Sequence, residues 1–242
     1  MKRSYLNVKA GKTRAQGGPS TSGLVKSILV GAALLAVPAA NAAPVTLIGD
    51  TINYVYDDSQ AGLALFGAPT IIGDVVRFLP TGFRAQSTNG SGFSGAFETF
   101  VFDRIFTRSG ADIRSVQLSE AGSYRIFGDG VVTADLSLLA SNNTGGAEFV
   151  QDTDSLFASG ASSLALFSLD VDLDINNTFG SPANDIALSI GNGLTATTTN
   201  VGDAAFVQKN LAFTAVSQVP LPAAAWLFGS AVAALLVARR KR

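Results

Sequence analysis

The sequence predicts an all-β fold, an antiparallel β-sandwich or jelly roll. About a dozen short apolar or alternating runs follow one another at spacings of roughly ten residues, separated by Gly, Asp, Asn and Ser. The long middle of the chain shows no amphipathic pattern of helical length. It also shows no repeat of fixed period, which disfavours a solenoid. The expected strands cover residues 45–48, 52–56, 63–66, 71–79, 97–106, 113–118, 124–127, 131–139, 147–150, 163–175, 186–190, 194–199 and 205–216.

Two runs carry this prediction most clearly. Residues 97–106 are rich in aromatic and β-branched side chains, as is typical of a packed sheet. Residues 163–175 show the strictest alternation, because the aspartates and the aliphatic side chains occupy alternate positions. One face of this strand should therefore carry Leu169, Val171, Leu173 and Ile175.

The connections between the strands are predicted from turn residues. Residues 81–95 are rich in Gly, Ser, Thr and Asn and are expected to form a loop. Gly110 and Gly122 are expected at turns, and Gly73-Asp74 suggests a bulge or a tight turn. Asp129-Gly130 lies between two strand-like runs, which favours a hairpin.

Residues 1–42 are predicted to be a secretory signal peptide. The first 26 residues contain basic but no acidic side chains, an apolar run extends over 28–37, and small residues follow. Ala40 and Ala42 occupy the positions that signal peptidase reads, so cleavage is expected before Ala43. An uncleaved membrane helix is the alternative, but ten apolar residues are too few to cross a bilayer.

The last segment, residues 219–242, combines an apolar run with a basic tail. As a helix, residues 223–238 are roughly 24 Å long against a hydrocarbon core of about 30 Å, which predicts a short transmembrane helix. Four cations then resist transfer through the membrane and keep the C-terminus in the cytoplasm. Hydropathy alone leaves open whether the segment is a permanent anchor or a processed signal. The cations are Arg239, Arg240, Lys241 and Arg242.

The start of this segment, Val219-Pro220-Leu221-Pro222, precedes the apolar run and the basic cluster. Together these features resemble the sorting signal of the PEP-CTERM family. The resemblance implies processing near Pro220-Leu221-Pro222 by an exosortase, a membrane cysteine transpeptidase, in a bacterium that builds exopolysaccharide. Leu221 stands where the family's Pro-Glu-Pro has glutamate, which leaves the exosortase subtype and the cleavage site open. The resemblance covers residues 219–242 alone, so the region before them stays unclassified.

The predicted exported domain, residues 43–218, is strongly acidic. It contains seven basic residues against all 18 acidic residues of the chain, a net charge of −11, whereas the whole chain carries −1. Such a surface repels phosphate backbones, which disfavours a nucleic-acid partner. Cysteine is absent, so the core alone, or bound ions, must hold the domain together. Roughly 175 residues are enough for one such domain.

Asp170, Asp172 and Asp174 form the best candidate for a binding site. Three carboxylates on one strand face repel each other, and a hard cation such as Ca²⁺ would relieve that repulsion. An EF-hand loop is excluded, because Ile175 stands where the loop needs glycine. The alternative is a solvated strand face whose charges discourage pairing with another sheet edge.

The composition excludes several kinds of catalysis. The chain has no His and no Cys, so Ser-His-Asp triads, Cys-His pairs and His-ligated zinc centres are impossible. Lys209 is the only lysine of the middle region, and no motif surrounds it. A carboxylate pair for glycoside hydrolysis stays open, with Glu98, Glu120 and Glu148 as candidates.

Aromatic platforms for sugar rings are not evident in the middle region. This part of the chain has no tryptophan. Tyr54 and Tyr56 share one face of a predicted strand and are expected to pack in the interior. The phenylalanines are expected to build the core.

The expected function is that of an exported, non-enzymatic protein of the cell surface or extracellular matrix. The resemblance to PEP-CTERM proteins implies association with exopolysaccharide or a biofilm. Signal peptidase and an exosortase are the expected processing partners, and no nucleic acid is expected. Before processing, the chain would cross the inner membrane once with its C-terminus in the cytoplasm. The alternatives are a Ca²⁺-dependent carbohydrate-binding or adhesion module and an extracellular polysaccharide-acting enzyme that uses a carboxylate pair.

Overall fold

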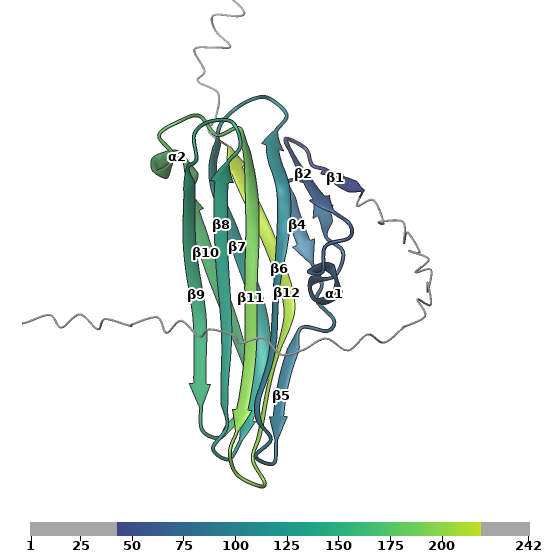
Figure 1. Cartoon of the computed structure of the whole chain (residues 1–242), viewed down its shortest axis with the longest axis vertical. Helices are drawn as coiled ribbons and strands as arrows, with labels where there is room; N and C mark the ends of the chain where they lie inside the picture. Colours follow the sequence, from purple (N-terminus) through teal and green to yellow (C-terminus); the bar gives the residue numbers. More distant parts are fainter. Residues whose placement is uncertain (1–42, 219–242) are drawn as a thin grey trace, which may run out of the picture. The chain divides into compact units, whose positions relative to one another are not determined.

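A computed structural model describes residues 43–218 as two six-stranded antiparallel sheets that pack face to face (Figure 1). The all-β prediction is confirmed, and the arrangement is a β-sandwich. Sheet A has the strand order β1 (Pro44–Ile48), β2 (Ile52–Asp57), β6 (Gly92–Thr107), β11 (Asp185–Thr198), β8 (Val131–Asn142) and β9 (Phe149–Ser159). Sheet B has the order β10 (Ser162–Asp174), β7 (Ile113–Phe127), β12 (Ala204–Gln218), β4 (Val75–Phe78) and β3 (Thr70–Ile72), and β5 (Arg84–Thr88) pairs with β12.

Two one-turn helices complete the described part of the chain, α1 (Leu63–Phe66) and α2 (Ile175–Thr178). Neither is long enough to span a bilayer. The predicted signal peptide and the predicted C-terminal helix lie outside the described residues.

The alternation predicted for residues 163–175 is present in β10 as far as Asp174, whereas Ile175, predicted as the last residue of the strand, is buried at the start of α2. Leu169, Val171 and Leu173 are buried, whereas the three aspartates between and after them are exposed. The backbone of β10 pairs with β7, and the β9–β10 turn links the edge of sheet A to the edge of sheet B. The amide of Asp170 donates to the carboxylate of Asp154 at 2.9 Å, which ties the two edges together.

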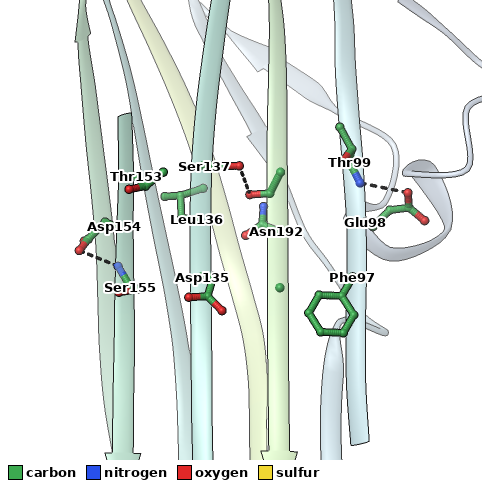
Figure 2. Close-up of a pocket in the computed structure, with 12 residues that line it drawn as sticks. Phe97, Glu98, Thr99, Asp135, Leu136, Ser137, Thr153, Asp154, Ser155 and Asn192 are labelled. Atoms are coloured by element: carbon green, nitrogen blue, oxygen red, sulfur yellow. Dashed lines mark hydrogen bonds between the residues drawn. The ribbon is translucent and has the colours of Figure 1, made fainter. Parts of the chain in front are cut away.

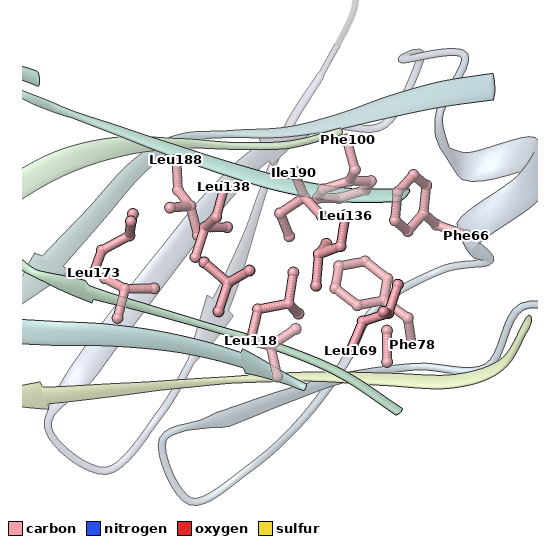
Figure 3. Packing of buried hydrophobic residues seen from close by; sticks show 14 of the residues in the cluster. Phe66, Phe78, Phe100, Leu118, Leu136, Leu138, Leu169, Leu173, Leu188 and Ile190 are labelled. Atoms are coloured by element: carbon pink, nitrogen blue, oxygen red, sulfur yellow. The ribbon is translucent and has the colours of Figure 1, made fainter. Parts of the chain in front are cut away.

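A cluster of aromatic rings fills one part of the space between the sheets. Phe100 lies at its centre, with ring centroids of Phe78 at 4.9 Å, Phe102 at 5.0 Å and Phe66 at 5.8 Å. Figure 3 shows the rings of Phe66, Phe78 and Phe100 beside the leucines and Ile190 that continue the core. Tyr54 is also fully buried, which confirms that this tyrosine packs in the interior.

Residues 63–66, predicted as a strand, form helix α1 instead. An apolar run of four residues cannot be assigned to strand or helix from its pattern alone. The single turn directs Phe66 into the aromatic cluster, where its ring contacts Phe78 and Phe83. Gly67 ends the turn with a φ of 77°, which glycine adopts without strain.

The loop predicted over residues 81–95 is also wrong for most of its length. Strand β5 occupies Arg84–Thr88, and β6 begins at Gly92. Backbone pairing with β12 and β11 holds these polar residues in strands, so tertiary pairing outweighs their weak strand propensity.

Two predicted breaks are likewise wrong, and one predicted turn joins different strands than expected. Gly122 lies inside β7, where the ring of Phe167 covers it and a Cβ would stand 2.2 Å from that ring. Gly191 and Gly193 lie inside β11, which runs through two predicted strands. The turn predicted at Asp129-Gly130 is present between β7 and β8, but it is no hairpin, because β7 belongs to sheet B and β8 to sheet A.

Candidate functional site

The candidate site is a shallow groove of about 500 Å³ on the outer face of sheet A (Figure 2). It crosses four strands, β6, β11, β8 and β9. Their register places outward-facing residues in two rows across the sheet. One row contains Thr99, Gly191, Ser137 and Thr153, and the next contains Phe97, Gly193, Asp135 and Ser155.

Two glycines of β11 form the floor of the groove. Gly191 and Gly193 face outward at the centre of the sheet, where side chains would otherwise fill the space. A Cβ on Gly193 would stand 3.0 Å from the ring of Phe97, so the ring leans over the bare backbone. The hollow therefore results from glycine at two alternate positions of one strand.

An exposed aromatic pair borders the groove at β6. The rings of Phe93 and Phe97 stack with a centroid distance of 6.3 Å and an interplanar angle of 10°. Their exposed fractions are 66% and 59%. The prediction that the phenylalanines build the core is wrong for these two, which instead present apolar ring surface to solvent.

Polar side chains line the rest of the groove. Ser137 donates to the carbonyl of Gly191 at 3.4 Å, and Asp135, Thr153 and Ser155 face the same hollow. These groups offer hydroxyl donors and a carboxylate acceptor beside apolar ring surface. A few oriented polar groups next to an aromatic surface are the usual composition of a small-molecule site.

The three predicted metal ligands lie on the exposed face of β10, each with its own partner. Asp170 accepts from Ser119 Oγ at 2.5 Å, and Asp172 accepts from Gln117 Nε2 at 3.0 Å. Asp174 caps α2 by accepting from the amide of Asn177 at 3.1 Å. Hydrogen bonds from Asn177 also lower the pKa of this carboxyl. Within residues 43–218 no three acidic side chains converge on one point, and Ca²⁺ binding stays a prediction.

The three glutamates considered for catalysis occupy different environments. Glu98 lines the groove, and its carboxylate accepts from the amide of Thr99 at 3.0 Å. Glu148 orders a loop by accepting from Gly180 N at 2.7 Å, and its hydrogen bonds lower the pKa of its carboxyl. Glu120 lies in the interior and is ion-paired with Lys209. Of the three, Glu98 alone borders the groove.

Most residues predicted for processing lie outside the described residues, namely Ala40, Ala42, 219–222 and 239–242. Ala43 is described, and its backbone nitrogen donates to the carboxylate of Asp58 at 3.2 Å. At the other end, the side chain of Gln218 donates to Thr51 Oγ1 at 2.6 Å. Both ends of the described domain are therefore held by hydrogen bonds within it.

The groove was not predicted from the sequence, although a signal for it exists there. Phe93, Gly95 and Phe97 alternate with the period of a strand, as do Gly191 and Gly193. The pairing of these two strands, which only the structure provides, turns the two patterns into one surface feature.

The fold and the groove define the chain as a β-sandwich with a hollowed outer sheet face. No protein-family model matches it, and no curated protein matches it either. One solved structure detected as similar is described as "TmCBM61 in complex with beta-1,4-galactotriose". It is 8% identical, with 74% of this chain and 90% of that chain covered, at a TM-score of 0.23.

Proposed function

We propose that this chain is an exported, non-enzymatic protein of the cell surface or extracellular matrix that binds exopolysaccharide through the groove on sheet A. The observation that carries the proposal is the exposed Phe93–Phe97 pair beside a glycine floor and a polar wall. Biofilm association and processing by an exosortase belong to the same proposal and rest on the sequence of residues 219–242.

The chemistry of the groove suits a neutral sugar chain. The face of Phe97 can cover the C–H surface of a pyranose ring, and Asp135 and Ser137 can pair with its hydroxyls. Residues 43–218 carry a net charge of −11, which repels polyanions. This repulsion acts over the longest range at low ionic strength. Neutral polysaccharides are therefore the expected ligands.

Removal of both terminal segments is compatible with the folded domain. Ala43 and Gln218 are tied to Asp58 and Thr51, so the hydrogen-bonded sandwich extends to the two predicted boundaries. The absence of His and Cys from the whole chain supports a non-enzymatic role. The predicted order is cleavage before Ala43, then transpeptidation near Pro220-Leu221-Pro222.

Replacing Phe97 with alanine tests the groove. We expect affinity for neutral exopolysaccharide of the producing cells to fall about tenfold, because an aromatic contact contributes roughly 1 kcal/mol or more. Calorimetry and co-sedimentation measure this change. Phe213→Ala is the matched control, since Phe213 lies on the opposite sheet and is also partly exposed.

Two results would contradict the proposal. One is wild-type affinity in the Phe97→Ala variant while the Phe213→Ala variant loses binding. The other is shortening of the polymer during incubation, which would show hydrolysis and favour the carboxylate-pair enzyme. Thermal unfolding of both variants checks that each is folded.

A further inference from the structure

Three polar side chains meet in the interior of the sandwich, beneath the part of β11 that forms the floor of the groove. Lys209 extends from β12 in sheet B, Asn192 from β11 in sheet A, and Glu120 from β7 in sheet B. Nζ of Lys209 contacts both Oε2 of Glu120 and Oδ1 of Asn192. Nδ2 of Asn192 donates to Oε1 of Glu120 at 2.9 Å. The carboxyl group therefore reaches the lysine amine with one oxygen and the amide nitrogen with the other.

The surroundings of these three side chains are apolar. The side chains of Lys209 and Glu120 are both 0% exposed. Glu120 pairs across the sheet with Leu169 and Ala212, and the ring of Phe83 lies 5.1 Å from the lysine nitrogen. All of these neighbours are buried. Bulk water is excluded from the site.

Burial favours the neutral forms of both ionisable groups. Desolvation lowers the pKa of the Lys209 ammonium and raises the pKa of the Glu120 carboxyl, although their mutual attraction acts in the opposite direction. Transfer of one proton from lysine to glutamate leaves a free amine beside a carboxylic acid. An uncharged amine is a nucleophile, and desolvation is a known way to activate lysine.

A buried ion pair of this kind contributes little net stability, because the cost of removing both charges from water offsets most of their attraction. Lys209 is also the only lysine in residues 43–218, where cysteine is absent. A domain exported without disulfides gains from another covalent constraint on its unfolded state. The contacts among Lys209, Glu120 and Asn192 therefore suit a reaction between the lysine amine and the asparagine amide as well as an ion pair.

We propose that Lys209 and Asn192 join in an intramolecular isopeptide bond, with Glu120 as the catalytic acid and base. Glu120 accepts a proton from the lysine ammonium, and the free amine Nζ attacks Cγ of Asn192 to give a tetrahedral intermediate. Glu120 passes this proton to Nδ2, the Cγ–Nδ2 bond breaks, and ammonia leaves. Glu120 then accepts the second proton that Nζ loses as it becomes the amide nitrogen. One C–N bond forms and one breaks, and no oxidant or cofactor is needed.

The bond would connect the two sheets through the core. Asn192 and Lys209 lie on consecutive strands, but β11 belongs to sheet A and β12 to sheet B. In the product the amide N–H can donate to Glu120, and the amide C=O can accept from the same carboxyl in its protonated form. This inference does not depend on polysaccharide binding, because the side chain of Asn192 reaches Glu120 and Lys209 between the sheets, whereas the groove opens on the outer face of sheet A.

The test uses the full chain, unfolded in denaturant after folding and digested with trypsin. Lys209 is the only tryptic site between Arg125 and Arg239. We expect no cleavage at Lys209 and a fragment that starts at residue 126 and continues past 209, lighter by about 17 Da, the mass of one ammonia. Tandem mass spectrometry should place the loss on the Lys209–Asn192 pair.

The digest also separates the proposal from succinimide formation, which removes the same mass at Asn-Gly sequences. Asn89-Gly90 and Asn192-Gly193 are both such sequences. A succinimide leaves the lysine amine free, so trypsin would cut at Lys209. Ammonia loss with cleavage at Lys209, or full mass with cleavage, overturns the isopeptide bond.

Glu120→Gln is the decisive variant, because glutamine keeps the size of the side chain but cannot accept the lysine proton. We expect the folded variant to show full mass and cleavage at Lys209. Lys209→Arg serves as the second variant, since it keeps a cation that cannot form this amide under the same conditions. A cross-link that persists in folded Glu120→Gln would remove Glu120 from the mechanism.

Discussion

Phe100→Ala is expected to lower the free energy of unfolding by about 3–5 kcal/mol. The ring is fully buried and contacts four other aromatic rings within the cluster. Phe66 comes from α1 and Phe78 from β4, so their rings cannot both move into the space that Phe100 leaves. The loss of stability therefore includes the transfer free energy of the removed ring and the free-energy cost of the cavity that remains.

Urea unfolding at equilibrium measures this loss. Phe213→Ala provides the matched control, because the same atoms are removed from a side chain that is 39% exposed on the outer face of sheet B. The control should change stability by less than half as much as Phe100→Ala. Equal losses at the two positions would contradict the packing described for the aromatic cluster.

Lys209→Met is expected to be about 3–5 kcal/mol less stable at pH 8 than a triple variant that also carries Glu120→Leu and Asn192→Leu. In Lys209→Met the carboxylate of Glu120 lies in the interior without a cation, whereas the triple variant removes all three polar side chains of the site. Apolar residues of similar size often replace a buried ionic cluster without cost. Neither variant can form the isopeptide bond, so the difference between their free energies of unfolding reports on Glu120 and Asn192 alone.

The pH dependence of Lys209→Met follows from the raised pKa of Glu120. Burial raises this pKa above about 4.3, the value expected in the unfolded chain. Between the two values the folded state holds a proton that the unfolded state has released, so stability falls as pH rises. The free energy of unfolding of Lys209→Met should therefore approach that of the triple variant near pH 4 and fall below it by pH 8. A constant difference across this range would show that the carboxyl is not buried.

The sheets of the sandwich were the most predictable part of the structure. The strict alternation of residues 163–175 reports which side of β10 is buried, because side chains of a strand alternate between its faces. Strand β5 and the start of β6 were missed, since their Ser, Gln, Thr and Gly residues match loop composition. Their backbone pairing is set by β12 and β11, which lie more than 100 residues later in the sequence.

The two candidate sites depend still more on long-range pairing. The groove requires four strands in one register, so no single stretch of sequence contains it. In the buried triad, Glu120 lies 72 residues from Asn192 and 89 residues from Lys209. Glu120 and Lys209 were noted in the sequence for separate reasons. The pairing of β7 with β12 in sheet B brings these two together, and the packing of sheet A on sheet B adds Asn192.

Export with processing at both ends is the central claim of the proposed function, and the termini of the mature protein test it most directly. Mass spectrometry of the protein recovered from the cell surface and the medium should show Ala43 as the first residue. It should also show a C-terminus at or near Pro220-Leu221-Pro222, without the basic tail. Recovery of an exported form that begins before Ala43 or still ends at Arg242 would contradict the claim.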